Sequence, residues 1–174
     1  LKIKHGTFDE EEPEQLMSVR YLTGFEKVLE IGGNIGRNSL IIAYILNNVG
    51  NCKNFVSMEC FNKYANRLIE NKDNNDLQLY VENSALSKVN LFQHKNKYWC
   101  IKQHNDLKST YVKLNTITYN ELQNKYNIDF DTLVLDCEGA FFYILKDFPE
   151  ILDNIKMIII ENDYQQINHK TYVH

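Results

Sequence analysis

The run VLEIGGNIG at residues 28–36 constrains the fold of this chain more than any other feature. An apolar stretch ends at Glu30 and Ile31, and a glycine-rich turn then leads into an apolar, helix-like segment. This order is typical of the first strand, turn and helix of a parallel sheet that binds a nucleotide at the carboxyl ends of its strands. A dinucleotide site would have G-x-G-x-x-G here, so that bare backbone amides meet the pyrophosphate. Because Ile31 replaces the first of those glycines and Glu30 would repel phosphate, the turn favours a cofactor that carries a cation.

Strand-like and helix-like segments alternate along the chain, which predicts an α/β protein with a Rossmann-like, doubly wound and mostly parallel sheet. A leading helix that begins near Pro13 is expected to pack through Leu16, Val19, Tyr21 and Leu22. The sequence TYNE at 118–121 is a capping box that opens a later helix. The pattern weakens over residues 87–114 and indicates an inserted hairpin, with strands near 91–92 and 98–101. The expected strands are 27–31, 54–59, 77–82, 132–136 and 156–161, and the expected helices are 13–22, 37–47, 63–71, 118–126 and 141–148.

Polar or acidic side chains follow every expected strand of the sheet. Because the carboxyl ends of parallel strands meet at one rim, these side chains are expected to gather there, although any one of them can simply solvate the edge. Glu59 stands where a carboxylate accepts hydrogen bonds from both hydroxyls of a ribose. Together with Glu30, it predicts S-adenosylmethionine (SAM), which carries an amino-acid cation at one end and a ribose beyond it. The residues at the rim are Glu30, Glu59, Asn83, Ser84, Asp136, Glu138, Glu161, Asn162 and Asp163.

Size and composition limit the other classes of function. A chain of 174 residues predicts one domain, and because Leu1 is not a start methionine, we expect that domain to come from a longer protein with other domains as partners. The net charge is −4 and the lysines look scattered, so neither nucleic acid nor a membrane is an expected partner. Four cysteines without a C-x-x-C pair predict free thiols in a reducing, cytoplasmic location.

Several segments together resemble the FkbM-type methyltransferases. They are EIGGNIG at 30–36, ME at 58–59, NSALS at 83–87 and DTLVLDCEGA at 131–140 followed by IL at 144–145, and the resemblance runs over residues 24–162. It implies a SAM-dependent O-methyltransferase that acts on a hydroxyl of a sugar, a glycan or another small metabolite. It also implies that Asp136 lies between cofactor and acceptor. The predicted cofactor-binding residues are Glu30, Gly32, Gly33, Asn34, Gly36, Glu59, Cys60, Ser84, Ala85 and Asp136.

Two departures from the family bear on this resemblance. Phe141 stands where the family commonly has a second glutamate, which puts the type of substrate in doubt more than the fold. Doubly wound methyltransferases usually add two further strands after the fifth, whereas this sequence stops at His174. We expect those C-terminal strands to be missing, whether through trimming, a disordered tail or a reduced fold.

Asp136 is the predicted catalytic residue, as a base or as an activator that acts through a metal. His169 is an alternative base, against the simpler interpretation of a histidine that faces solvent. Asp136 with Glu161 and Asn162 resembles the Mg²⁺ ligands of sugar and catechol O-methyltransferases, where the ion lowers the pKa of the hydroxyl. Acids that only line a polar crevice would give the same pattern.

Three other functions stay open at this point. The first is a module that binds SAM without turnover, which Phe141 and the short C-terminus would allow. An RNA ribose methylase is disfavoured by the acidic composition, and a nicotinamide oxidoreductase is disfavoured by Glu30 and Ile31.

Overall fold

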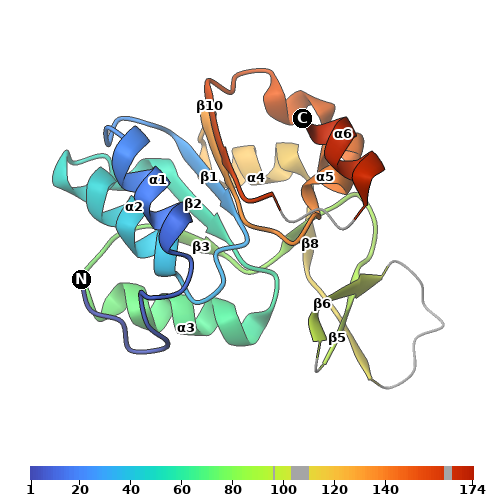
Figure 1. The fold of residues 1–174 in the computed structure, drawn as a ribbon, viewed down its shortest axis with the longest axis horizontal. Coiled ribbons are helices and arrows are strands. Elements are labelled where there is room, and N and C mark those ends of the chain that lie inside the picture. Colours follow the sequence, from blue (N-terminus) through green and yellow to red (C-terminus); the bar gives the residue numbers. More distant parts are fainter. Residues whose placement is uncertain (96, 103–109, 163–165) are drawn as a thin grey trace.

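The central element of the fold is a five-stranded parallel sheet with the strand order β10-β9-β1-β2-β3. A computed structural model describes residues 1–95, 97–102, 110–162 and 166–174, with the backbone alone for 97–102. Helices cover both faces of the sheet (Figure 1), which confirms the predicted α/β class. The strands are β1 (Val28–Ile31), β2 (Phe55–Met58), β3 (Tyr80–Glu82), β9 (Thr132–Leu135) and β10 (Met157–Ile160), and the helices are α1 (Glu12–Tyr21), α2 (Arg37–Asn48), α3 (Asn62–Asp73), α4 (Tyr119–Tyr126), α5 (Phe141–Asp147) and α6 (Ile167–Val173), with 3-10 turns at Cys52–Asn54 and Pro149–Leu152.

Alternation along the strands builds a separate hydrophobic core on each face of the sheet. Val28 belongs to the core under α1, α2 and α3, whereas Leu29 and Ile31 belong to the core under α4 and α5. Phe55 and Val56 divide in the same way. Because successive side chains of a strand point to opposite faces, Glu30 lies on the α2 side and Ile31 on the α5 side.

The strand order reverses between β1 and β9, since the chain runs outward from β1 through β2 to β3 and then returns to β9 on the other side. Ligands of open parallel sheets bind at such a point, outside the carboxyl ends of the strands. The register pairs Ile31 of β1 with Leu135 of β9, so the two loops that follow these strands start side by side.

Helix boundaries follow local signals in the sequence. Thr118 and Glu121 form both hydrogen bonds of the predicted capping box at the start of α4. Helix α2 begins after Gly36, whose φ of 94° suits a residue without a side chain.

Helix α1 differs from the prediction in the face that it buries. Leu22, just after the helix, is buried as expected, but Leu16 and Val19 are 60% and 59% exposed. The buried residues are instead Gln15, which donates to the carbonyl of Glu10 at 2.7 Å, and Ser18, which donates to Asn38 of α2 at 2.8 Å. Polar contacts therefore set the orientation of α1, and an apolar pattern alone did not reveal them.

The segment between β3 and α4 is an insert that projects from the central domain and contains a small sheet of its own (Figure 1). The predicted hairpin is present as β5 (Phe92–His94) and β6 (Lys97–Lys102), which are antiparallel. A third strand that was not predicted, β7 (Tyr111–Lys113), pairs with the other side of β5. The two-residue strands β4 (Ala85–Leu86) and β8 (Thr116–Ile117) pair in parallel at the base of the insert.

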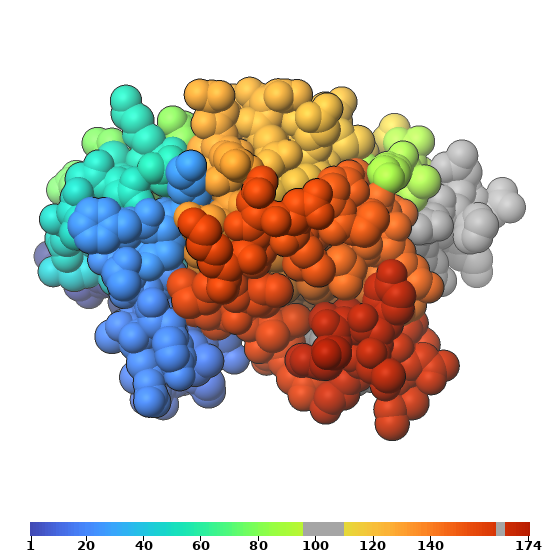
Figure 2. Space-filling view, turned by 90° about the horizontal axis from the view of Figure 1, so that it is seen from above, coloured from blue at the N-terminus to red at the C-terminus, as the bar shows by residue number. Residues whose placement is uncertain are grey.

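The N-terminal segment, in blue, and α6, in dark red, lie at separate places on the surface (Figure 2). In the described ranges, no helix is both long enough and apolar enough to cross a membrane.

Candidate functional site

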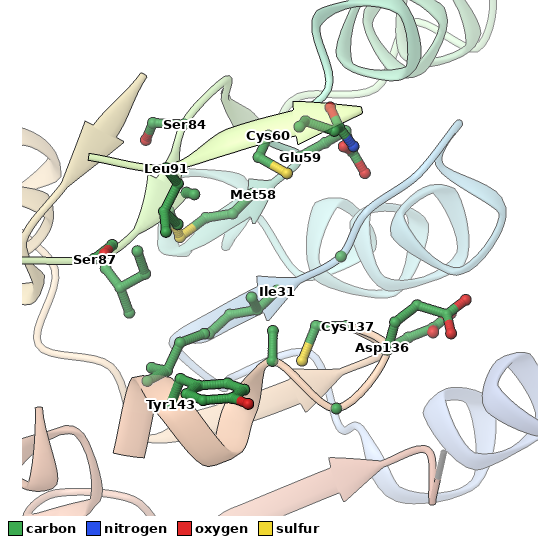
Figure 3. Close-up of a pocket in the computed structure, with 18 of the residues that line it drawn as sticks. Ile31, Met58, Glu59, Cys60, Ser84, Ser87, Leu91, Asp136, Cys137 and Tyr143 are labelled. Atoms are coloured by element: carbon green, nitrogen blue, oxygen red, sulfur yellow. The ribbon is translucent and has the colours of Figure 1, made fainter. Parts of the chain in front are cut away.

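A cavity of about 530 Å³ opens at the carboxyl ends of β1, β2 and β9. Its wall combines the turn after β1, the ends of β2 and β3, the insert, and α5 (Figure 3). The carboxyl groups of Glu59 and Asp136 lie toward one end, and Ser87 and Tyr143 lie toward the other (Figure 3). The described lining residues are Ile31, Gly32, Asn34, Met58, Glu59, Cys60, Tyr64, Ser84, Ala85, Leu86, Ser87, Leu91, Gln93, Asp136, Cys137, Glu138, Gly139, Ala140, Tyr143, Ile144 and Asp147.

The glycine turn brings the backbone of β1 close to its neighbours. A side chain at Gly32 would place its Cβ 1.7 Å from the carbonyl oxygen of Asp136, and Gly32 has a φ of 98°. At Gly33, a Cβ would lie 2.2 Å from the hydroxyl of Ser57. Both amides donate to the carbonyl of Met58, at 3.0 and 2.9 Å. Glycines are therefore needed for the turn to pass between β2 and β9, with Gly32 on the wall of the cavity and Gly33 behind it.

Glu30 lies behind the turn and is not part of the cavity wall. Its Oε2 accepts a hydrogen bond from Ser57 at 2.5 Å and another from Ser39. Burial raises the pKa of Glu30 to about 7, against the lowering effect of those two hydroxyls. The alternation of β1 turns this side chain to the α2 face, and its expected role toward a cofactor stays a prediction.

Glu59 lines the cavity at the end of β2, as predicted for a residue that meets the cofactor. Its Oε2 accepts the backbone amide of Asn34 at 2.9 Å and its Oε1 accepts that of Phe61 at 2.6 Å. Burial raises the pKa of this carboxyl to about 7, although the two amides favour the charged form. Each oxygen keeps a further lone pair, so Glu59 can still accept a pair of hydroxyls from a ligand.

The other predicted cofactor residues fall into two groups. Asn34, Cys60, Ser84 and Ala85 lie on the cavity wall. The hydroxyl of Ser84 donates to Glu82 at 2.9 Å, and burial raises the pKa of the Cys60 thiol to about 12. Gly36 is not on the wall but packs against Leu68 of α3.

Asp136 lies on the cavity wall after β9 and is hydrogen-bonded to Glu161, which follows β10. Burial, and then this second carboxyl, raise the pKa of Asp136 to about 9. Two carboxyl groups in contact hold one proton between them, because both cannot ionise at close range without repulsion. At neutral pH this pair therefore keeps a proton.

The predicted Mg²⁺ site is only partly assembled. Asp136 and Glu161 meet, but Asn162 is exposed, and the described part of the chain has no group of three His, Cys, Asp or Glu side chains that could hold a metal ion. Asp163, which also follows β10 in the sequence, lies outside the described residues. The arrangement does not support a Mg²⁺ site, and no step below depends on one.

His169 does not reach the cavity. Its ring stacks on Phe142 with the centroids 3.7 Å apart and meets Tyr143 edge-on at 5.4 Å. These contacts join α6 to α5 and keep His169 on the far side of Tyr143 from the cavity wall. The role of His169 as an alternative base stays a prediction that these contacts do not favour.

The sequence analysis missed the wall that α5 contributes. Ala140, Tyr143, Ile144 and Asp147 line the cavity at the spacing i, i+3, i+4 and i+7, which is one face of a helix. This spacing was present in the sequence and would have identified the residues. Leu91 and Gln93 of the insert were also missed, and their spacing of two is that of one strand face.

All charged residues on the described wall are acidic: Glu59, Asp136, Glu138 and Asp147. An anion in this cavity would meet these four carboxyl groups, of which only Asp136 shares a proton with a neighbour at neutral pH, and no described cation, whereas a cation or a neutral polar ligand would be accommodated. The site therefore disfavours a pyrophosphate and favours a ligand with positive charge.

Comparisons with known proteins support the fold. A crystal structure described as the O-methyltransferase from Bacillus cereus in complex with SAH is similar with a TM-score of 0.53 and 15% sequence identity, over 98% of this chain and 68% of that chain. No protein-family model matches the sequence, and no curated protein does either. The resemblance to FkbM-type methyltransferases therefore stays a prediction, and the structural likeness shows a Rossmann-like fold.

Proposed function

We propose that this chain is a SAM-dependent O-methyltransferase that acts on a hydroxyl group of a sugar, a glycan or another small metabolite. The observation that carries the proposal is the cavity wall at the reversal of the strand order, where every described charge is acidic and Glu59 has lone pairs available for a ribose. SAM matches this wall because it presents a cation and a ribose and has no phosphate. The structural likeness to an O-methyltransferase in complex with SAH agrees with this proposal.

Each part of the wall has a role in this proposal. Glu59 accepts the two ribose hydroxyls, and the turn at Gly32 leaves room for the cofactor to lie against the backbone. When bound, SAM supplies a methyl group on a positively charged sulfur, which a hydroxyl oxygen can attack in line. Asp136 takes the proton of that hydroxyl once its own shared proton has left.

The same site favours one other function, a module that binds SAM without turnover. Asp136 keeps a proton at neutral pH, and Phe141, which stands where FkbM-type methyltransferases commonly have a glutamate, is buried in the core. Neither residue supplies an ionised base at neutral pH. Methyl transfer, and not cofactor binding, distinguishes this alternative from the first proposal.

Titration calorimetry of the protein with SAM, SAH, NAD and ATP tests the cofactor. We expect SAM and SAH to bind and the two phosphate compounds to give no heat. Tight binding of NAD or ATP, with no response to SAM or SAH, would refute the proposal. Transfer of a labelled methyl group from SAM to a panel of sugars and glycans then separates the enzyme from the binding module.

A further inference from the structure

The carboxylate of Glu82, the last residue of β3, is buried just behind the cavity wall. Its Oε1 accepts a hydrogen bond from the hydroxyl of Ser84 at 2.9 Å. Its Oε2 accepts two more, from Nζ of Lys125 at 2.6 Å and from the hydroxyl of Tyr126 at 2.8 Å. Glu82 itself does not line the cavity, whereas Ser84 does. The carboxylate therefore joins the C-terminal end of α4 to a residue of the wall.

Glu82 is ionised at neutral pH. Burial works against its charge, but the hydrogen bonds from Lys125, Tyr126 and Ser84 outweigh burial and hold the pKa of this carboxyl below its ordinary value. An ionised carboxylate has no hydrogen to donate and can only accept. The hydrogen between Glu82 and Ser84 must therefore belong to Ser84.

The hydroxyl of Ser84 is thereby fixed as an acceptor toward any further group. A serine hydroxyl has one hydrogen and two lone pairs, and the hydrogen of Ser84 is committed to Glu82. Ser84 is buried, with 4% of its surface exposed, and no described residue donates to its oxygen. A polar ligand group that meets this oxygen from the cavity must bring a hydrogen of its own.

Ser84 lies near the residue that meets the ribose in our proposal. The amide of Glu59 donates to the carbonyl of Glu82 at 3.0 Å, which joins the ends of β2 and β3. Cys60 lies between Glu59 and Ser84 (Figure 3). Asp136 lies across the cavity from Ser84 (Figure 3). A nucleoside whose ribose is held by Glu59 and whose sulfur faces Asp136 therefore directs its base toward Ser84.

We propose that Glu82 is a positioning residue that acts through Ser84 and selects a cofactor whose base carries an amino group, adenine rather than hypoxanthine. This role rests on the proposed function, since it needs a nucleoside of the SAM type in the cavity. The exocyclic amino group of adenine donates a hydrogen bond, which the oxygen of Ser84 can accept. Hypoxanthine has a carbonyl oxygen at the same place, so two acceptors would meet, and a hydrogen bond could form only at the expense of the one to Glu82.

The substitution Glu82→Gln should reverse the direction of the hydrogen bond to Ser84. Glutamine has one oxygen and one amide nitrogen, and the two donors Lys125 and Tyr126 converge on the Oε2 side. The oxygen of the glutamine is therefore held at that side, and its NH₂ group faces Ser84. Ser84 then accepts from the glutamine, and its own hydrogen can point into the cavity toward a carbonyl oxygen.

Titration calorimetry with SAH and with S-inosylhomocysteine, which has a carbonyl oxygen in place of the amino group of adenine, measures the preference for the base. We expect the unmodified protein to bind SAH at least about tenfold more tightly. In Glu82→Gln this ratio should fall to about one or invert, because the base with the carbonyl gains the hydrogen bond that adenine loses. In Ser84→Ala the ratio should also fall to near one, because neither base then has a partner at this place.

Tyr126→Phe is the matched control, since it removes a hydrogen bond from the same carboxylate but at the other oxygen. It should keep the contact between Glu82 and Ser84, and hence the preference for SAH, even where it lowers the midpoint of thermal unfolding. A purely structural role of Glu82 would instead make the two substitutions alike, with lower stability and an unchanged ratio in both.

Equal affinities for the two nucleosides in the unmodified protein would overturn this role of Glu82. A full preference for SAH in a folded Glu82→Gln variant would do the same. Where that variant does not fold, Ser84→Ala decides, and an unchanged preference in it overturns the role. Absence of binding by both nucleosides would refute the proposed function itself.

Discussion

Asn34 donates its backbone amide to Oε2 of Glu59 at 2.9 Å and thereby ties the turn after β1 to the end of β2. One carboxylate thus holds the shape of the turn and, in our proposal, the ribose of the cofactor. The substitution Glu59→Gln tests both tasks. Glutamine keeps one oxygen that can accept a hydrogen bond from the turn, but it loses the negative charge and the second acceptor oxygen.

Glu59→Gln should weaken SAH binding by about 1–3 kcal/mol, which is the size of a lost set of charge-assisted hydrogen bonds. Titration calorimetry measures this change, and thermal unfolding shows whether the turn has loosened. Glu150→Gln, at an exposed carboxylate in the 3-10 turn after α5, is the control and should bind SAH normally. An unaltered affinity in Glu59→Gln would remove this residue from the site.

Gly32→Ala should destabilise the domain far more than Gly50→Ala. Both glycines have a positive φ, of 98° and 76°, so both substitutions carry the backbone cost of about 1–2 kcal/mol. Only at Gly32 would the new methyl group also collide with a carbonyl, that of Asp136, whereas nothing lies within 4 Å at Gly50. Urea unfolding measures both, and similar losses in the two variants would contradict the close approach of β1 to the loop after β9.

The stability of the domain should fall between pH 7 and pH 9 because of Asp136. The pKa of this carboxyl rises from 3.8 to about 9 on folding, so the folded protein holds a proton that unfolding releases. The stabilisation that this proton gives to the folded state is complete below pH 3.8 and is lost as the pH rises through 9. Glu30 and Glu59 act in the same direction, but only up to about pH 7. The midpoint of thermal unfolding should therefore fall across this window in the unmodified protein and stay nearly level in Asp136→Asn.

If the domain transfers methyl groups, kcat/KM should increase as the pH rises toward 9. Asp136 accepts a proton only after the one it shares with Glu161 has left, and the pKa of about 9 describes that loss. Glu161→Gln removes the neighbouring negative charge, which lowers the pKa of Asp136 and moves the rise in the profile to lower pH. A profile that is flat from pH 6 to 9 in the unmodified protein would exclude Asp136 as the base.

The sequence was sufficient to predict the fold class because its signals are local. The glycine turn, the capping box at Thr118 and Glu121, and the alternation of strands and helices are each visible within a few residues, and each is present in the structure. Glu59 and Asp136 line the cavity as the sequence led us to expect, because the end of a parallel strand is a position that sequence can define, and their roles stay predictions.

The sequence did not reveal the directions in which some side chains point or the contacts between residues distant in the chain. Glu30 was expected in the crevice, but one position along β1 decides which face a side chain meets, and the partners Ser39 and Ser57 that enclose it come from other elements. His169 was considered from its place after a strand, whereas its stacking on Phe142 depends on how α6 packs against α5. The single-domain assignment, the family and the acceptor stay predictions.

Successive side chains of β1 face opposite sides of the sheet, so this short strand contributes to both hydrophobic cores and to the cavity wall. Val28 and Glu30 serve the α2 face, while Leu29 and Ile31 serve the α5 face and the cavity. Deleting one residue from β1 would exchange the two sets, so that a carboxylate would enter the α5 core and an isoleucine would face the serine hydroxyls. A single substitution on the cavity wall changes one side chain, whereas an insertion or deletion within β1 changes the face that every later side chain of the strand meets.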